Sequence, residues 1–330
     1  MSQFPPGLRL PVSDASLYPK RPLWSDLGGT TRELPHVDRD PLWRTLNPSV
    51  ALSPTGELAI ALRTSNYYLD PSTGEYFVFD GGPIRSRTYV AGLTDELELT
   101  EKTLVDWDPA GPDIRRGVED CRLFWRDNQW RLLGVLVEDH SPVARQVEYS
   151  VELGSGNATW TTTHGSPVGV DERRSQKNWM CPYDETDEFE FVYGPTEVLR
   201  HGELLSRRDD VPGDAMLRGG SLLWRLDDGS YLALVHRTAS MRLAPRYSAL
   251  SYVTIFPMLR DYRHLLARYD ASGRLVALSP EFSFLEPGVE FGSGLVVRGK
   301  DLVLSFGSWD ASAHLATVPL ETALEWLQPV

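Results

Sequence analysis

The stretch RRGVEDCRLFWRDNQWRLLGVL, residues 115–136, places two carboxylates and a guanidinium directly before an apolar, strand-like run. Ionised side chains are costly to bury unless they are paired or take part in function. Glu119, Asp120 and Arg122 therefore form either a structural ion pair or the floor of an active site. A carboxyl in a partly desolvated pocket beside a second carboxylate has a raised pKa and can donate a proton. Asp120 is thus the candidate general acid, with Glu119 as its catalytic neighbour.

The elements that must position these groups are strands. Most of the chain consists of short alternating or continuous apolar runs, separated by turns rich in Gly, Asp, Asn and Pro. Helical periodicity is confined to the C-terminal PLETALEWLQPV, which predicts one or two turns of helix. The strand-like runs include GELAIALRTSNYY, EYFVFDGG, QWRLLGVLVED, EFEFVYGP, SYLALVHRT and DLVLSFGSWD. The sequence therefore predicts an all-β protein.

A divergent repeat underlies these runs, in which a short apolar strand, a polar turn and a second, more apolar strand follow a polar or small residue. Five copies recur at intervals of roughly 40–75 residues, a range typical of propeller blades with loop insertions. The copies are NPSVALSPTGELAIALRTSN, CRLFWRDNQWRLLGVL, NWMCPYDETDEFEFVYGP, GGSLLWRLDDGSYLALVHRT and GSGLVVRGKDLVLSFGSWD. Five units of about four strands predict a five-bladed β-propeller. A β-sandwich with an appended β-domain would explain the strands but not the five matched pairs.

The innermost strand of each propeller blade lines the central channel, so residues at the start of these strands gather at one mouth. We expect a single polar pocket there, the default position for a binding site. The residues at these positions are Asn47, Glu119, Asp120, Arg122, Lys177, Asn178, Arg218 and Glu290. The propeller is predicted to span residues 45–330 as one domain, and the Pro-rich residues 1–44 to pack on it.

Composition restricts the partners of this pocket. The 330-residue chain has a formal net charge of -13, which argues against nucleic acid and against an anionic membrane surface. It has no run of about 20 apolar residues and no signal-peptide pattern at its start, so we expect a cytoplasmic protein. Cys121 and Cys181 are expected to be free buried thiols. The sequence predicts no metal site and no cofactor, and it leaves the oligomeric state open.

The motifs resemble glycoside hydrolase family 130, the five-bladed propeller β-mannoside phosphorylases and mannosidases. GVEDCR is similar to the family signature G-x-E-D-P-R, and NPSVAL to its Asn-Pro opening, with Arg63 on the following strand. KNWMCP is similar to the third-blade segment that leads to a Pro. RGGSLLWRLDDGSYLALVHRT resembles the fourth blade, which ends in a His, and SGLVVRGKDLVLSFGSWD resembles the last, with Asp310. The resemblance covers about residues 45–320.

The resemblance implies inverting cleavage or transfer of a mannosyl-like unit, with Asp120 acting through a sugar hydroxyl. It implies a carbohydrate substrate, with inorganic phosphate or a nucleotide sugar as a further partner. Positive charge for a phosphate would come from Arg63, Lys177, Arg218 and His236. Sugar hydroxyls would be bound by Asn47, Asn66, Asn178, Arg122 or Asp310, the last of which could instead orient His236. Rings for stacking would come from Trp179, Tyr193, Tyr247 and Tyr252.

Two positions depart from the family pattern. Cys121 stands where the family has Pro, and Tyr193 where it has a His that helps to hold phosphate. Hydrolysis by water, or glycosyl transfer from a nucleotide sugar or sugar phosphate, therefore remain alternatives to phosphorolysis. A propeller without chemistry, serving as a carbohydrate-binding or scaffold module, is a third. The long segment 237–264 is either an insertion on a blade edge or a lid over the site.

Overall fold

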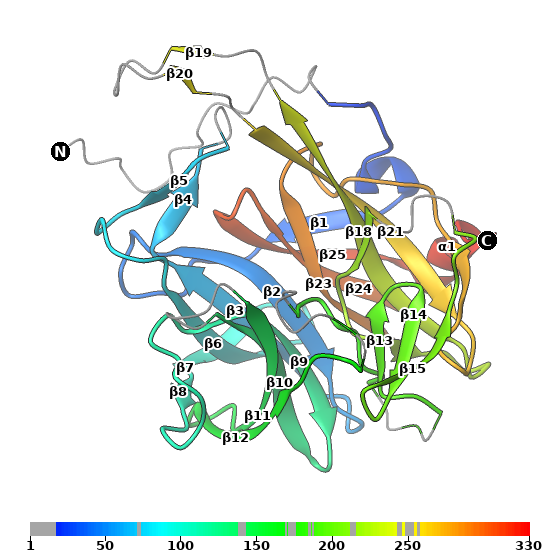
Figure 1. Ribbon diagram of the computed structural model, residues 1–330, viewed down its shortest axis with the longest axis horizontal. Helices are drawn as coiled ribbons and strands as arrows, with labels where there is room; N and C mark the ends of the chain where they lie inside the picture. The colour runs from blue at the N-terminus through cyan, green and yellow to red at the C-terminus, as the bar shows by residue number, and fades with distance from the viewer. Residues whose placement is uncertain are drawn as a thin grey trace.

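The computed structural model describes residues 18–70, 74–137, 143–168, 170, 176–183, 186, 188–211, 216–242, 246–247, 254–255 and 258–330. Five small, mostly antiparallel sheets are arranged as the blades of a five-bladed β-propeller, which confirms the predicted fold (Figure 1). The predicted C-terminal helix is also present as the short α1 (Leu320–Glu325). No helix among the described residues is long and apolar enough to cross a membrane.

The blades follow one another along the chain, and each sheet runs outward from the channel. Blade 1 has the order β2 (Arg44–Leu52), β3 (Leu58–Ser65), β6 (Ser86–Leu93) and β7 (Leu99–Leu104). Blade 2 has β9 (Val118–Arg126), β10 (Gln129–Val137), β11 (Ala144–Val151) and β12 (Asn157–His164), with β8 (Asp106–Trp107) at its edge. Blade 3 is smaller, with β13 (Phe191–Gly194), β14 (Glu197–Arg200) and β15 (Glu203–Arg207). A bridge from Met180 to Val192 extends it toward the channel.

Blade 4 is the largest sheet. It contains β16 (Leu217–Gly219), β17 (Trp224–Arg225), β18 (Tyr231–Arg242), β21 (Met258–Tyr269), β22 (Leu275–Leu278) and β26 (Gln328–Pro329). Strands β18 and β21 pair over their full length, from Tyr231 with Tyr269 to Arg242 with Met258. Their ends project beyond the other blades (Figure 1). Two short hairpins accompany the blades: β4 (Tyr67–Leu69) with β5 (Tyr76–Val78), and β19 (Arg246–Tyr247) with β20 (Thr254–Ile255).

Blade 5 closes the ring with a strand from the other end of the chain. Its order is β23 (Glu290–Arg298), β24 (Asp301–Ser308), β25 (Ser312–Pro319) and β1 (Thr30–Glu33). The short helix η2 (Trp24–Leu27) precedes β1 and buries Trp24 completely. The Trp24 ring packs against Phe282, Phe284 and Trp326. Burying an aromatic ring removes a large apolar area from water, so this contact stabilises the closed ring.

The inner blade strands are apolar because neighbouring blades cover both of their faces. All eight residues of β3 are buried, and so are seven of the nine residues of β2. This explains why the sequence reads as continuous apolar runs rather than strict alternation. Cys121 and Cys181 are free and buried in this core, as predicted.

Three residues near the start of the innermost segments of blades 1, 2 and 3 have a backbone in the left-handed region. Asn47 has φ 44°, Asp120 φ 49° and Asn178 φ 65°. Asn and Asp tolerate this region better than other residues with a side chain. The pairing register also shifts beside Asn47 in β2 and beside Asp120 in β9. A bulge of this kind bends a strand and re-aims a side chain, here toward the channel mouth.

Candidate functional site

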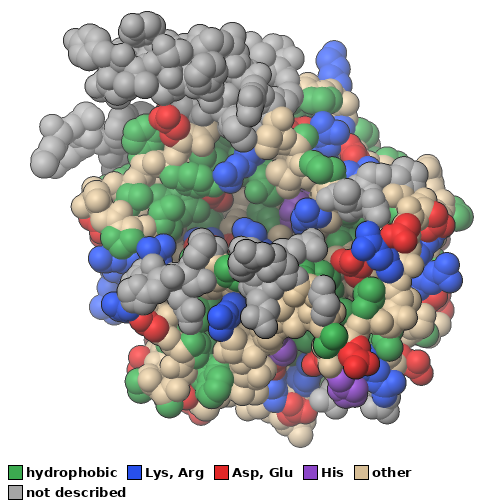
Figure 2. All heavy atoms as spheres, in the orientation of Figure 1, with side chains coloured by type: hydrophobic (Ala, Val, Ile, Leu, Met, Phe, Trp, Pro, Cys, Tyr) green, Lys and Arg blue, Asp and Glu red, His purple; other side chains and the backbone are tan. Residues whose placement is uncertain are grey.

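A cavity of about 850 Å³ lies at the mouth of the propeller and is visible as a hollow near the centre of the face in Figure 2. All five blades contribute to its wall, as the propeller geometry predicts. Of the side chains expected there, the cavity brings together Asn47, Arg63, Glu119, Asp120, Lys177, Asn178, Tyr193, Arg218, His236 and Asp310. Residues up to 263 positions apart in the sequence thus share one pocket, whose volume is within the range for small-molecule sites.

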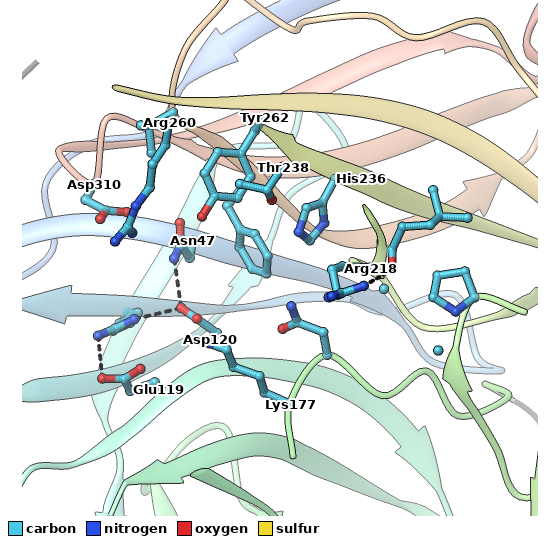
Figure 3. A pocket seen from close by; sticks show the side chains of 18 of the residues that line it. Asn47, Glu119, Asp120, Lys177, Arg218, His236, Thr238, Arg260, Tyr262 and Asp310 are labelled. Atoms are coloured by element: carbon cyan, nitrogen blue, oxygen red, sulfur yellow. Dashed lines mark hydrogen bonds and ion pairs between the residues drawn. The ribbon is translucent and has the colours of Figure 1, made fainter. Parts of the chain in front are cut away.

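One end of the cavity holds the two adjacent carboxylates of blade 2 with Arg63 between them. Arg63 Nη1 donates to Asp120 Oδ1 at 2.8 Å, and its Nη2 lies 3.1 Å from Glu119 Oε1. Asn47 Nδ2 also donates to Asp120 Oδ1, at 2.8 Å (Figure 3). Arg63 is held in turn by a 2.9 Å bond from its Nε to Ser86 Oγ. The guanidinium therefore serves both carboxylates from a fixed, buried position.

The expectation that Asp120 has a raised pKa is wrong. Burial opposes its ionisation, but Arg63 and the hydrogen bond from Asn47 outweigh burial and hold the pKa of Asp120 below its ordinary value. The sequence argument gave weight to the adjacent Glu119 and missed that Arg63 compensates both charges. Asp120 is consequently ionised near neutral pH when no ligand is bound.

Asp310 is a second cavity carboxyl with a different environment. It follows β24 with φ 49° and accepts a 3.1 Å hydrogen bond from Tyr67 Oη on its Oδ2. Burial raises the pKa of Asp310 to about 6, because it outweighs the opposing effects of Arg63 and Tyr67. The charge of Asp120 contributes to the rise. The alternative expectation that Asp310 orients His236 is not met, since its described partner is Tyr67.

This raised pKa predicts a pH-dependent stability for Asp310→Asn. The stabilisation by the protonated carboxyl is complete below the unfolded-state pKa of about 3.9. It is lost as the pH rises through the folded-state pKa of about 6. The amide cannot ionise, so we expect the variant to gain stability relative to the wild type as the pH rises from about 4, reaching about 3 kcal/mol by about pH 8. Urea unfolding at several pH values measures this.

The matched control for that measurement is Asp301→Asn, an exposed carboxyl at the start of β24. We expect its stability to follow the wild-type pH profile. Parallel profiles for Asp310→Asn and the wild type would show that Asp310 titrates alike in the folded and unfolded chain.

The opposite end of the cavity is cationic. Arg218 lines it beside the almost fully buried ring of His236, and Lys177 lies below Asp120, between the two ends (Figure 3). Burial lowers the pKa of His236 to about 3, and the positive charges of Arg122, Arg218 and Lys177 lower it further. The imidazole of His236 is therefore neutral near neutral pH, and it can donate a hydrogen bond to a ligand. A guanidinium beside a neutral donor, with the Lys177 ammonium in the same cavity, forms a suitable place for an anion.

Three of the predicted binding residues lie outside the cavity wall and have structural roles. Arg122 is fully buried and donates to Gly220 O at 2.6 Å and to Asn178 Oδ1 at 3.2 Å, which links blades 2, 3 and 4. Strict alternation would place Arg122 on the same side as Asp120, but the bulge between them turns it beneath the floor.

Glu290 and Asn66 were also expected in the pocket, but both lie outside its wall and hold turns. Glu290 is fully buried and accepts hydrogen bonds from the backbone N–H groups of residues 284, 285 and 286, which fixes the turn before β23. Asn66 fixes the turn at residues 80–85, since its Oδ1 accepts from Arg85 N at 2.7 Å and its Nδ2 donates to Pro83 O at 3.1 Å. Both side chains form hydrogen bonds with the backbone of a turn. A single sequence does not distinguish this structural role from ligand binding.

The predicted stacking rings differ in outcome. Tyr193 lines the cavity, whereas Trp179 is 3% exposed and packs against Phe191 and Tyr193 in the core. Tyr252 and the side chain of Tyr247 lie outside what the structure describes. The two ends of segment 237–264 are the paired strands β18 and β21, and residues 246–247 and 254–255 form the short β19–β20 pair. The rest of its middle lies outside the described residues. Its role as a lid stays a prediction.

Several cavity residues were missed by sequence reasoning, namely Tyr67, Tyr76, Thr238, Arg260 and Tyr262. They come from the β4–β5 hairpin and from the projecting ends of β18 and β21. All except Thr238, the last residue of the fourth repeat copy, lie outside the repeated strand pair. Arg260 Nη1 donates to Tyr76 Oη at 2.7 Å and so connects the hairpin to blade 4. Among the described residues, no group of three or more His, Cys, Asp or Glu side chains could hold a metal ion.

Similarity to known proteins is found at the level of structure and not of sequence. No family model matches the sequence. No curated protein matches it. Among solved structures, a glycoside hydrolase of the glycoside hydrolase family 130 mannoside phosphorylases, which targets β-1,2 mannosidic linkages in Candida mannan, aligns with TM-score 0.55 and 17% identity. That alignment covers 84% of this chain and 85% of the other.

Two phosphorylases align equally well. The β-1,2-mannobiose phosphorylase from Listeria innocua, in complex with β-1,2-mannobiose, has TM-score 0.55 and 12% identity, over 90% of this chain and 99% of the other. A mannose phosphorylase from Leishmania mexicana, in complex with a phosphate ion, has TM-score 0.55 and 15% identity, over 90% of both chains. At these identities the likeness establishes the fold. It confirms the resemblance to glycoside hydrolase family 130 at that level.

Proposed function

We propose that the protein is a carbohydrate-active enzyme that cleaves a β-mannoside with inversion and transfers the mannosyl unit to inorganic phosphate. The observation that carries this proposal is the division of one cavity into two ends. Asp120, Glu119 and Asp310 supply carboxyl groups at one end, where Arg63 and Arg260 also lie, and Arg218 supplies positive charge at the other, with Lys177 between them (Figure 3). Glycosidic cleavage needs carboxyl groups at the scissile bond, and an anionic acceptor needs cations.

The similarity in fold to a mannobiose phosphorylase and to a phosphate-bound mannose phosphorylase supports the choice of sugar and acceptor. The cavity also offers Tyr193 and Phe291 as apolar surfaces beside its polar groups. Such surfaces pack against the C–H faces of a sugar while hydroxyls bond to Asn47 or Asn178.

The test is to incubate the protein with β-1,2-mannobiose and inorganic phosphate and to measure mannose 1-phosphate. We expect phosphate-dependent product in the wild type. Arg218→Met should raise the KM for phosphate about 10–100-fold, because a charge-assisted bond to an anion contributes about 1.5–3 kcal/mol. Arg225→Met, at an exposed position on β17 of the same blade, is the control and should leave this KM unchanged.

Other outcomes distinguish the remaining functions. Free mannose at a rate independent of phosphate would establish a hydrolase. Consumption of GDP-mannose in the presence of a sugar acceptor would establish a glycosyltransferase. Sugar binding without turnover of any donor would establish a binding module and contradict the proposal.

A further inference from the structure

The β4–β5 hairpin at the edge of the cavity has two faces with different surroundings. Its register places Tyr68 opposite Phe77 and Leu69 opposite Tyr76. Residues two apart in a strand share a face, and so do residues directly opposite each other on paired strands. Tyr67 and Tyr76 line the cavity. The rings of Tyr68 and Phe77 therefore lie on the other face of the hairpin, outside the cavity.

This outer face carries a stack of aromatic rings. The Tyr68 ring stacks on Phe77, with centroids 5.1 Å apart and planes 15° apart, and on Phe79, at 6.0 Å and 23°. Phe77 is 37% exposed, and Tyr68 and Phe79 are half-buried. Figure 2 shows hydrophobic side chains gathered over this hairpin, beside the hollow of the cavity. Apolar rings that gather at the surface are typical of a binding site, and these adjoin a cavity.

The direction in which a substrate leaves the cavity follows from the proposed reaction. Cleavage with inversion puts the incoming phosphate and the leaving oxygen on opposite faces of the anomeric carbon. Asp310 and Arg218 lie on opposite sides of the pocket (Figure 3). With phosphate at the Arg218 end, the leaving sugar lies toward the carboxyl groups.

The hairpin forms part of the rim at this carboxyl end. Tyr67 Oη donates to Asp310 Oδ2 at 3.1 Å, and Tyr76 Oη accepts a 2.7 Å hydrogen bond from Arg260 Nη1. Tyr76 lines the cavity and is also exposed, so it lies where the cavity opens to solvent. A chain of sugars attached to the leaving oxygen can therefore leave the cavity over this hairpin and reach its outer rings.

The chemistry of the stack suits a sugar chain. A pyranose can pack its C–H face on an aromatic ring while its hydroxyls stay in water. The three rings are uncharged, as is a mannoside chain. Ring pairs across strands also stabilise a hairpin that has three residues in each strand, so an experiment must separate binding from support of the hairpin.

We infer that Tyr68, Phe77 and Phe79 form a subsite for the sugars beyond the leaving oxygen, and that the protein acts on β-mannoside chains longer than a disaccharide. The inference rests on the proposed function and names the substrate class of the same site. The cavity binds the scissile linkage, and the outer face of the hairpin binds the part of the chain that a disaccharide lacks.

The test compares phosphorolysis of β-1,2-mannobiose and β-1,2-mannotetraose with phosphate in excess. We expect the wild type to have a kcat/KM about tenfold higher on the tetraose. Phe77→Ala should lose about 3–10-fold in kcat/KM on the tetraose and less than about twofold on mannobiose, mainly through KM, because only the longer chain reaches the ring.

Two further variants separate binding from support of the hairpin. Phe77→Leu keeps an apolar side chain in the hairpin but removes the ring face, and it should show the same selective loss on the tetraose. Trp160→Ala is the matched control, because the Trp160 ring is 39% exposed on β12 of blade 2. It should leave kcat/KM on both substrates unchanged.

The inference and the proposed function fail in different ways. Equal kcat/KM for the two chain lengths in the wild type would overturn the inference while the proposed function stands. Equal losses on both substrates in Phe77→Ala and Phe77→Leu would also overturn it, since the rings would then only support the hairpin that carries Tyr67 and Tyr76. A wild type inactive on β-mannosides of either length would instead remove the proposed function, and the inference with it.

Discussion

Asp120→Asn is expected to lower kcat/KM for phosphorolysis of a β-mannoside about 10²–10³-fold, since it removes a fixed charge aimed at the reacting centre. The hydrogen bonds of Asn47 and Arg63 to Asp120 Oδ1 show that the carboxylate is held before a substrate binds. An amide can still accept through its oxygen, so the position keeps its shape and loses its charge. We therefore expect the loss in kcat rather than in KM.

The measurement is steady-state kinetics of the wild type and the variant with phosphate in excess, together with sugar binding by calorimetry. Asp106→Asn, an exposed carboxyl in β8, is the matched control and should retain wild-type rates. Unchanged turnover in Asp120→Asn would assign Asp120 a structural role. Binding retained while turnover is lost would separate an enzyme from a carbohydrate-binding propeller.

The blade pattern was accessible from the sequence because each blade repeats a local signal. A short apolar strand, a polar turn and a longer apolar strand recur in every copy, and the structure has sheets at all five. Residues near the start of the inner strands were therefore a sound guide to the channel mouth in blades 1 to 3, as Asn47, Asp120 and Asn178 demonstrate. The guide failed at Glu290, which starts β23 and is buried against a turn. Closure by β1 was not expected, because Thr30–Glu33 carries no apolar run and is exposed throughout.

The direction of each side chain was less accessible. In a regular strand, residues two apart share a face, and this rule placed Arg122 beside Asp120 in the pocket. The left-handed backbone at Asp120 and the adjacent bulge reverse the rule, and Arg122 lies under the floor. The protonation state of Asp120 could not be predicted from the sequence either, because its lowered pKa depends on Arg63, which is 57 residues away in the sequence. Neither a bulge nor such a distant charge pairing can be read from spacing alone.

The cavity-wall residues that the sequence did not indicate show a third limit of sequence-based prediction. Tyr76 and Tyr262 come from different blades, and each reaches the pocket on a segment that extends its blade. Segments of this kind differ in length from copy to copy, so they have no counterpart in the repeat. Their aromatic content was noted for residues 237–264 but could not be assigned to a position. Long-range contacts such as Arg260 with Tyr76 decide where these rings lie.

The largest loss of stability is expected for Arg63→Met. Arg63 is 5% exposed and compensates Glu119 and Asp120 together, at 3.1 and 2.8 Å. Removing one partner of a buried ion pair costs about 3–5 kcal/mol, because the remaining charges lose their compensation. For a domain of this size we expect Tm to fall by about 4–8 °C. Arg200→Met, at an exposed position at the end of β14, is the control and should change Tm little.

The pH dependence separates this charge effect from a loss of packing. The pKa of Asp120 is lowered in the folded state, so its contribution to stability is present above the unfolded-state pKa of about 3.9 and is lost as the pH falls through the lower folded-state value. The difference in unfolding free energy between wild type and Arg63→Met should therefore be largest near neutral pH and shrink in acid. Arg63→Met combined with Asp120→Asn should recover about 1–3 kcal/mol, since the second change removes a charge left without a partner. A difference that stays constant with pH, and a double variant no more stable than Arg63→Met, would mean that the methionine fails through packing and that the guanidinium does not compensate the two carboxylates.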